Sequence, residues 1–366
     1  MLYGRKGNLH VHTTRSDGTG TFAQLAEAAR RAELDWLIIT DHNTFALEEQ
    51  GWRDGVLLLV GQELHEWDQS PLLEARSSGV SAERKQRNHL LVLGAHADLA
   101  VYAYDPALAL QKAHAAGGLC VLAHPYEHSG AYAHEPEINW ERWDLADQAD
   151  GLELWNYMSE FKAHLSSALG ALVAAVWPRL VMRGPYSETL ARWDALLGER
   201  PCVGLGGSDA HAVEYSLGPL RRRVFPYEVL FRMLNVHALV EGEWSGDLAA
   251  DEARLLTALR AGCCYIAYDG LCDGSGFEFA LHSGTGQVLP MGATVHWPCD
   301  GALLASTPAS ARMELWHNGR LAAVHSGREL TWPVVEPGIY RIIARRRYAL
   351  GWRAWIISNA IRVVAP

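Results

Sequence analysis

Short apolar runs that end in histidine or a carboxylate recur along the first 210 residues of the chain. Residues 36–40 lead into Asp41 and His42, residues 56–60 into Glu63, residues 119–123 into His124, and residues 202–205 into Asp209 and His211. Segments with helical periodicity, such as 21–31, alternate with these runs, which predicts an α/β architecture. Barrels built from repeated βα units carry their chemistry at the carboxyl ends of the strands. The recurrence therefore predicts a barrel with a polynuclear metal site.

The amino-terminal stretch 8–18 supplies two more histidines and an aspartate. Residues i and i+2 of an extended segment point to the same face, so His10 and His12 are expected to present two imidazoles to one point. The loop that follows is expected to bring Asp17 close to them. A pair of histidines is weak evidence in a chain with 17 of them, so the assignment depends on partners further along the chain.

Length and sequence texture divide the chain into two predicted domains. At 366 residues the chain is long for one compact domain. Residues 1–275 are expected to form the barrel, with a helical insertion at about 157–197 as a lid over the pocket. From residue 276 helical periodicity gives way to alternating strands, and Asn318-Gly319 predicts a β-hairpin. Residues 276–366 are therefore interpreted as a small all-β sandwich with a structural or oligomeric role.

Composition narrows the partners and the compartment. The formal net charge of −10 disfavours a polyphosphate partner, so long nucleic acid is not an expected substrate. The six cysteines lack CxxC spacing and imply no disulfide framework. The histidine pair begins at residue 10, which leaves no room for a signal peptide, and the most apolar stretch, 165–177, is too short to span a bilayer. A soluble protein of the reducing cytoplasm, without a membrane partner, is expected.

The strand-end residues form a candidate ligand set with a common chemistry. It comprises His10, His12, Asp17, His42, Glu63, His89, His124, Asp209 and His211. All nine offer nitrogen or oxygen donors, which suit Zn, Mn or Fe. No cysteine joins them, so a closed structural zinc site is not expected. A cofactor of two to three divalent metal ions is predicted.

The motifs that carry these residues resemble those of the PHP (polymerase and histidinol phosphatase) superfamily. They are His10-Val11-His12 with Ser16-Asp17-Gly18, Thr40-Asp41-His42-Asn43, Gly61-Gln62-Glu63, His89-Leu90-Leu91, Ala123-His124-Pro125 and Gly207-Ser208-Asp209-Ala210-His211. The six motifs occur in order and cover about residues 8–270. The appended β region and the stretch 151–156 resemble the branch around carbaryl hydrolases (CehA/McbA-like).

This resemblance implies a distorted (β/α)7 TIM-like barrel that holds three metal ions. The first ion would take His10, His12, Glu63 and Asp209; the second would share Glu63 and add His89 and His124; the third would take Asp17, His42 and His211. All nine positions match the family pattern, which argues against a degenerate, non-catalytic member. Asp41 is expected to orient the neighbouring loop or a ligand.

A site of this composition predicts a metal-dependent hydrolase. A hydroxide held between two cations is a nucleophile at neutral pH, and the cations absorb charge that develops in a displacement at phosphorus. A small, anionic phosphate ester is the expected substrate, with Asp209 and His211 as catalytic residues: Asp209 holds a metal and accepts a proton, and His211 positions the leaving side. Two alternatives stay open: a carboxylic or carbamate ester hydrolase that uses the same site, and a non-catalytic metal-binding scaffold or sensor.

Residues near the ligand set are candidates for substrate contact. They are Tyr126, His128, Trp155, Asn156 and Arg183. Glu153 is expected either to support a ligand or to hold the barrel. His65, like several other histidines near these segments, is expected to serve packing or to lie on the surface. The sequence leaves the exact substrate and the oligomeric state open.

Overall fold

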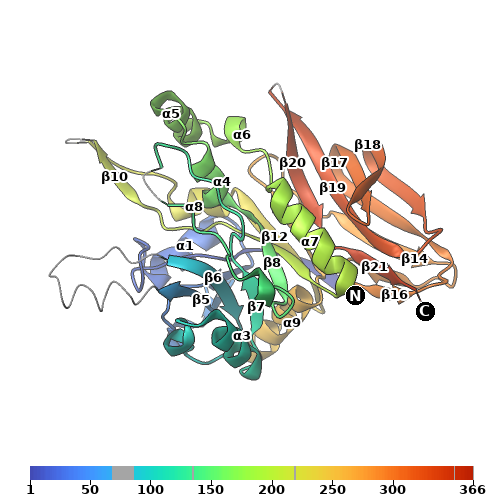
Figure 1. Ribbon diagram of the computed structural model, residues 1–366, viewed down its shortest axis with the longest axis horizontal. Helices are drawn as coiled ribbons and strands as arrows, with labels where there is room; N and C mark the ends of the chain where they lie inside the picture. The colour runs from blue at the N-terminus through green and yellow to red at the C-terminus, as the bar shows by residue number, and fades with distance from the viewer. Residues whose placement is uncertain (68–85, 134–135, 218–219, 350, 366) are drawn as a thin grey trace.

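The computed structural model describes residues 1–67, 86–133, 136–217, 220–349 and 351–365 (Figure 1). The strands of the amino-terminal part are β1 Leu2–Asn8, β2 Trp36–Ile39, β3 Gly51–Arg53, β4 Val56–Val60, β5 Gln62–Trp67, β6 Gln86–Leu93, β7 Leu119–Leu122, β8 Gly151–Asn156, β9 Val203–Gly207, β10 Glu214–Leu217, β11 Leu220–Arg223, β12 Leu234–Glu241 and β13 Cys264–Tyr268. The helices are α1 Phe22–Arg31, α3 Pro106–Ala115, α4 Tyr157–Ala163, α5 Ala168–Val176, α6 Pro178–Val181, α7 Ser187–Glu199, α8 Tyr227–Phe231 and α9 Leu248–Arg260, with short 3-10 turns at Leu47–Glu49, Ala100–Tyr102 and Trp143–Leu145. The carboxyl-terminal strands are β14 Glu278–Ser283, β15 Val288–Pro290, β16 Thr294–His296, β17 Gly301–His317, β18 Arg320–Pro333, β19 Gly338–Tyr348, β20 Gly351–Ser358 and β21 Ile361–Val364.

The strands of the α/β part pair into two main sheets, and the strands do not all run parallel. One sheet holds β12, β1, β2 and β4 in adjacent places, and the other has the order β5-β6-β7-β8-β9. β7, β8 and β9 are parallel, but β6 runs antiparallel to both β5 and β7. Two isolated bridges, His42 to Glu63 and Val11 to Ala210, connect the sheets. They lie at the β5 edge and beyond the β9 edge of the five-stranded sheet. The α/β fold with an added β-rich region is confirmed; a closed seven-stranded barrel stays a prediction, and β6 departs from repeated parallel βα units.

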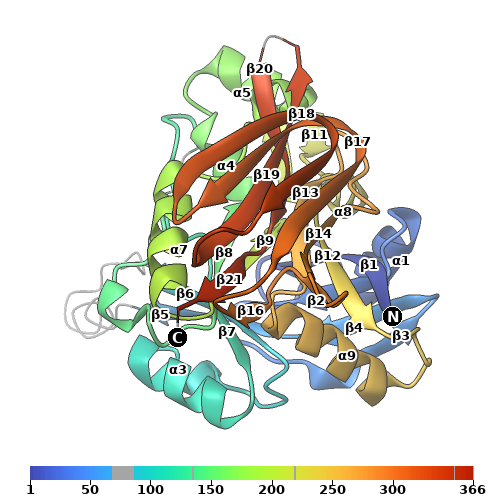
Figure 2. The ribbon, with the colours of Figure 1, turned by 90° about the vertical axis from the view of Figure 1, so that its right-hand side faces the viewer.

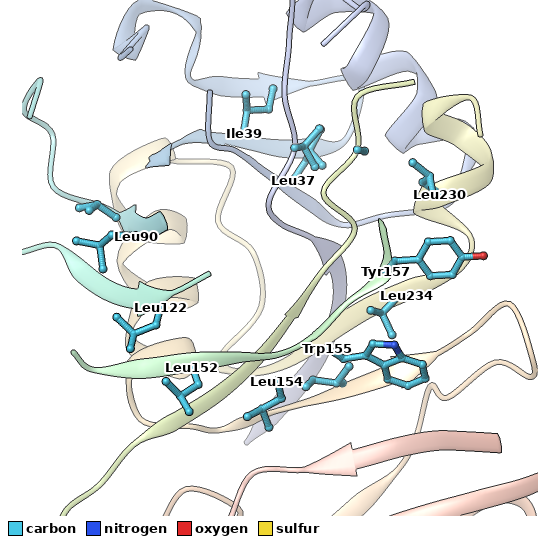
Figure 3. Close-up of a cluster of buried hydrophobic side chains, with 14 of the residues drawn as sticks. Leu37, Ile39, Leu90, Leu122, Leu152, Leu154, Trp155, Tyr157, Leu230 and Leu234 are labelled. Atoms are coloured by element: carbon cyan, nitrogen blue, oxygen red, sulfur yellow. The ribbon is translucent and has the colours of Figure 1, made fainter. Parts of the chain in front are cut away.

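Successive side chains of strands such as β2 and β6 point to opposite faces of the sheet, and both faces are buried. One hydrophobic cluster contains Leu37 and Ile39 of β2 and Leu90 of β6, together with the leucines and Trp155 drawn in Figure 3. A second cluster contains the intervening residues Ile38 and Leu91. Burial on both faces explains why these strands appear in the sequence as continuous apolar runs rather than as an alternating pattern. His89 shares a strand face with Leu91, so the histidine lies at the end of the second cluster.

The helical insertion predicted at about 157–197 is present as helices α4 to α7. Pro178 occupies the first turn of α6, and Pro185 lies between α6 and α7, where each proline interrupts the helical pattern. The α1 helix begins at a reciprocal capping box formed by Thr21 and Gln24. Among the described helices, none is long and apolar enough to cross a membrane.

The carboxyl-terminal part is built from β-strands and shares a sheet with the α/β part. The Asn318-Gly319 hairpin is confirmed: β17 and β18 pair around it, and both turn residues have positive φ, as a tight hairpin turn requires. β13, which precedes the predicted boundary at residue 275, pairs with β20, which follows it, so backbone hydrogen bonds join the two predicted domains. The division into 1–275 and 276–366 stays a prediction.

A buried ion pair attaches the insertion to the carboxyl-terminal strands. The guanidinium of Arg341 on β19 donates two hydrogen bonds of 2.7 Å to the carboxylate of Asp194 on α7. The rings of Trp193 and Trp316 lie within 5.6 Å and 4.8 Å of the same guanidinium. Figures 1 and 2 both show α7 against these strands. The Arg341–Asp194 ion pair therefore attaches α7 of the helical insertion to β19 of the β-rich region.

Candidate metal centre

Glu63 on β5 is a fully buried carboxylate surrounded by imidazoles. Its Oε2 atom lies 3.1 Å from His10 Nε2, 3.2 Å from His12 Nε2 and 3.1 Å from His42 Nδ1, and its Oε1 atom lies 2.6 Å from His89 Nδ1 and 3.2 Å from His124 Nε2. The two oxygens therefore face two different groups of histidines. This is the arrangement expected of a carboxylate that bridges two cations.

Asp209 closes the Oε2 side of this arrangement. Its Oδ1 atom lies 3.5 Å from His10 Nε2 and 3.4 Å from His12 Nε2. The loop after β9 that carries Asp209 is tied to the amino-terminal strand, because the Ala210 amide donates to the His10 carbonyl and the His12 amide donates to the Ala210 carbonyl. Residues 200 positions apart thus meet through backbone pairing.

Asp17 lies on the solvent side of the cluster. Its carboxylate is 3.5 Å from His42 Nε2 and 3.2 Å from His211 Nε2. Donor atoms of His12, Asp17, His42 and His211 all lie within 4.8 Å of one another. The structure therefore brings all nine sequence-predicted ligands into one cluster, and His12 adjoins both Asp17 and Asp209.

Several donor atoms in the cluster are buried without a hydrogen-bond partner. They are His10 Nε2, His12 Nδ1 and Nε2, His42 Nδ1, Glu63 Oε2 and His89 Nε2. Buried polar atoms almost always have a hydrogen-bond partner in proteins. A group of buried nitrogen and oxygen atoms that face one another without hydrogen bonds is therefore best explained as a binding site for a cation. Nitrogen and carboxylate donors fit divalent cations such as Zn, Mn or Fe.

Electrostatic shifts reflect the crowding of charges. Burial alone would raise the pKa of Glu63, but the facing imidazoles, chiefly His10, hold that pKa well below its usual range. The pKa of Asp209 is also held well below its usual range, since His10 and its neighbours outweigh burial. Burial opposes protonation of His124, but Glu63 and Glu127 raise its pKa to about 9. The carboxylates are thus held ionised, as metal ligands must be.

Two further buried carboxylates support the cluster, one through contacts with candidate ligands and one through the loop between His12 and Asp17. Glu153 on β8 accepts from His10 Nδ1 at 2.9 Å and from the His124 amide at 2.8 Å, which leaves His10 Nε2 facing Glu63. Asp41 accepts hydrogen bonds from the amide and hydroxyl of Thr13, both at 2.6 Å, and from Ser16 Oγ. Both residues occupy the supporting positions that the sequence suggested for them.

The predicted substrate contacts are distributed unevenly around the cluster. Asn156 donates from Nδ2 to Glu153 and to Asp209, so its amide supports ligands directly. Tyr126, Trp155 and Asn156 line a small pocket beside His124. Trp155 is buried, and its indole donates to Glu160 at 2.7 Å.

His128 and Arg183 are not among the residues that line this pocket. His128 is half exposed, and its Nε2 atom lies 3.7 Å from Glu188. The exposed Arg183 lines a different pocket, together with Ile343 and Ala354 of the carboxyl-terminal strands. Contacts of all five residues with substrate stay predictions.

His65 is a buried neighbour of the cluster that sequence reasoning set aside. Its ring centroid lies 4.9 Å from that of His42 and 5.0 Å from that of His89. The available signal was its spacing from Glu63, because residues i and i+2 of a strand share a face and both residues lie on β5. The His10–His12 segment, by contrast, lies beyond the end of β1, and His10 has a φ of 62°, so that pair is not held by an extended strand. Burial, together with the nearby imidazoles, lowers the pKa of His65 to about 2.

Comparison with known proteins finds a family model, a curated relative and solved structures that are similar to this chain. A curated phosphoribosyl 1,2-cyclic phosphate 1,2-diphosphodiesterase from Eggerthella lenta is 35% identical over 91 residues, which are 24% of this chain and 30% of that protein. A two-domain protein from Bacteroides vulgatus, described as containing a predicted PHP-like metal-dependent phosphoesterase, covers 98% of this chain and 95% of its own at 11% identity, with a TM-score of 0.44. A putative metal-dependent phosphoesterase from Bifidobacterium adolescentis covers 56% of this chain and 87% of its own at 18% identity, with a TM-score of 0.33. The PHP domain family model matches residues 8–199, so the chain belongs to the PHP domain family.

Proposed function

We propose that the protein is a metal-dependent hydrolase that acts on a small phosphate ester at a trinuclear site. The observation that carries the proposal is the position of Glu63, whose two oxygens face separate groups of imidazoles. One ion would be held by His10, His12, Glu63 and Asp209, a second by Glu63, His89 and His124, and a third by Asp17, His42 and His211. The unpaired buried nitrogens of these histidines fit that role.

In the proposed reaction the bound cations, Asp209 and His211 would have different roles. Divalent cations at this cluster would supply an activated water and absorb negative charge in the transition state. Asp209 has one oxygen toward His10 and His12 and the other toward Asn156. In the proposal it would hold a cation and accept a proton. His211 Nε2 lies 3.2 Å from Asp17, which is on the solvent side of the cluster, and this histidine would position the leaving group.

A phosphate ester is the proposed substrate for two reasons. The three buried or half-buried carboxylates Asp17, Glu63 and Asp209 offset only part of the charge of three divalent cations, so the loaded site would attract an anion. The relative of 35% identity is a phosphodiesterase by name, although it matches this chain over only 91 residues. A carboxylic or carbamate ester is the second candidate, because the stretch 151–156 and the β-rich region resemble the carbaryl hydrolase branch, and we place the chain in that branch as part of the proposal.

A side-by-side assay distinguishes these substrate classes. The Mn-loaded protein is expected to hydrolyse at least one of the phosphomonoesters, cyclic nucleotides or bis-phosphorylated nucleotides. Its rate with that compound is expected to exceed its rate with aryl carbamates and carboxylic esters. Turnover of carbamates alone would replace the phosphoesterase proposal with the second candidate. If a metal-replete protein turned over none of these compounds, the scaffold interpretation would stand instead.

A further inference from the structure

We propose that His65 supplies a tenth donor to the metal centre, as a nitrogen ligand that the nine-residue set does not include. The inference rests on the proposed function, because it assigns His65 to the same centre. Nitrogen atoms of His42, His65 and His89 all lie within 4.8 Å of one another. His42 belongs to the third proposed ligand group and His89 to the second, so His65 adjoins both.

A β-bulge places the His89 and His65 rings together. Leu64 of β5 pairs with Leu90 of β6, and Glu66 pairs with Arg87, so two residues of β6 lie opposite His65 alone. The extra residue, Asn88, has a φ of 53°, and its side chain donates to Glu66 at 2.6 Å. Bulges of this kind change the direction of a side chain next to a functional site. The local backbone is thus shaped to present His89 toward His65.

Hydrogen bonds from Asn43 hold the loop of His42 against the strand of His65, the third member of the trio His42, His65 and His89. Asn43, which follows His42, accepts from the His65 amide through Oδ1 at 3.1 Å and donates from Nδ2 to the His65 carbonyl at 3.4 Å. The Asn43 amide also donates to the Glu63 carbonyl at 3.0 Å. One asparagine, with a φ of 44°, therefore locks the loop that carries His42 to the strand that carries His65.

The chemistry of the trio favours a metal over plain packing. His65 and His89 are each 3% exposed. Both His42 Nδ1 and His89 Nδ1 also touch Glu63, so a cation near the trio would gain a carboxylate close by. Clustered imidazoles beside a carboxylate are a donor set that Zn, Mn and Fe accept.

Metal binding by variants of the full chain tests the assignment. After chelation, wild type, His65→Gln, His65→Cys and His282→Ala would be titrated with Mn²⁺ or Zn²⁺ against a competing chelator, and bound metal measured by elemental analysis. His65→Gln keeps a polar side chain but removes the ring nitrogens, whereas His65→Cys restores a ligand atom. His282→Ala is the matched control, since it removes an imidazole from the exposed face of β14.

We expect His65→Gln to bind one ion fewer per chain, or to bind it more than about 100-fold more weakly, which exceeds the roughly tenfold to 100-fold loss typical of removing a group that only supports a ligand. His65→Cys is expected to recover part of the binding, and His282→Ala all of it. Equal binding by His65→Gln and wild type would overturn the inference, and so would equal loss in the Gln and Cys variants, which would indicate packing. If wild type and His282→Ala bound no metal, the proposed function itself would fail.

Discussion

Replacing Asp209 with asparagine is expected to abolish turnover while the fold stays intact. The substitution removes the negative charge that faces His10 and His12, and it removes an acceptor for a proton in the reaction. Loss of general base catalysis alone costs about 10²-fold to 10⁴-fold in rate, and the weaker ligand adds to that loss. Rates with the best substrate from the panel, at saturating metal, give the measurement.

The same position tolerates asparagine structurally. Asp209 has a φ of 53°, a left-handed conformation in which asparagine is as acceptable as aspartate. The matched control is Asp54→Asn, which makes the same chemical change at an exposed turn residue with a φ of 51°. We expect wild-type rates and wild-type unfolding temperature for Asp54→Asn. Activity retained by Asp209→Asn would refute its proposed role.

Replacing Glu63 with glutamine is expected to remove most of the bound metal together with the activity. Five imidazoles lie within 3.2 Å of the Glu63 carboxylate, and a neutral amide cannot bridge two cations as strongly. Elemental analysis should find two to three ions per chain in wild type and at most about one in Glu63→Gln.

Metal-dependent stability gives a second measurement on the Glu63 variant. A ligand present at 100 times its dissociation constant stabilises the folded state by about 2.7 kcal/mol. Added Mn²⁺ should therefore raise the unfolding temperature of wild type by several degrees and raise that of Glu63→Gln much less, because the variant retains at most about one ion. Glu278→Gln, on the exposed face of β14, is the control and should respond as wild type does. A full Mn²⁺ response in Glu63→Gln would show that the carboxylate does not bridge metals.

Local features of the fold were predictable wherever the signal lies within a few residues. The hairpin at Asn318-Gly319 depends on neighbouring residues, and the structure confirms it. The capping box of Thr21 and Gln24 depends on residues three positions apart. The direction of β6 was not predictable, because a run such as His89-Leu90-Leu91 buries both faces equally in a parallel or an antiparallel strand. The pairing of β13 with β20 joins segments about 90 residues apart, which a local pattern does not encode.

The ligand set was more predictable than its surroundings. Metal ligands are chemically distinctive and occur at strand ends, so Asp17, Glu63 and Asp209 stand out in the sequence. The support from Glu153 and Asn156 depends on how β8 lies beside the amino-terminal strand, and only the structure shows that contact. The spacing of His65 from Glu63 placed it on the same strand face, but its proximity to His89 depends on a bulge in the facing strand, which the sequence does not show.

The most direct test of the metal centre is a crystal structure of the Mn-loaded protein, with anomalous scattering recorded at the manganese edge. We expect anomalous peaks on both sides of the Glu63 carboxylate, one bounded by His10, His12 and Asp209 and one by His89 and His124, and a third between Asp17, His42 and His211. A metal-replete crystal with no peak in contact with Glu63, or with one ion bound through a single oxygen of that carboxylate, would contradict the proposed metal centre.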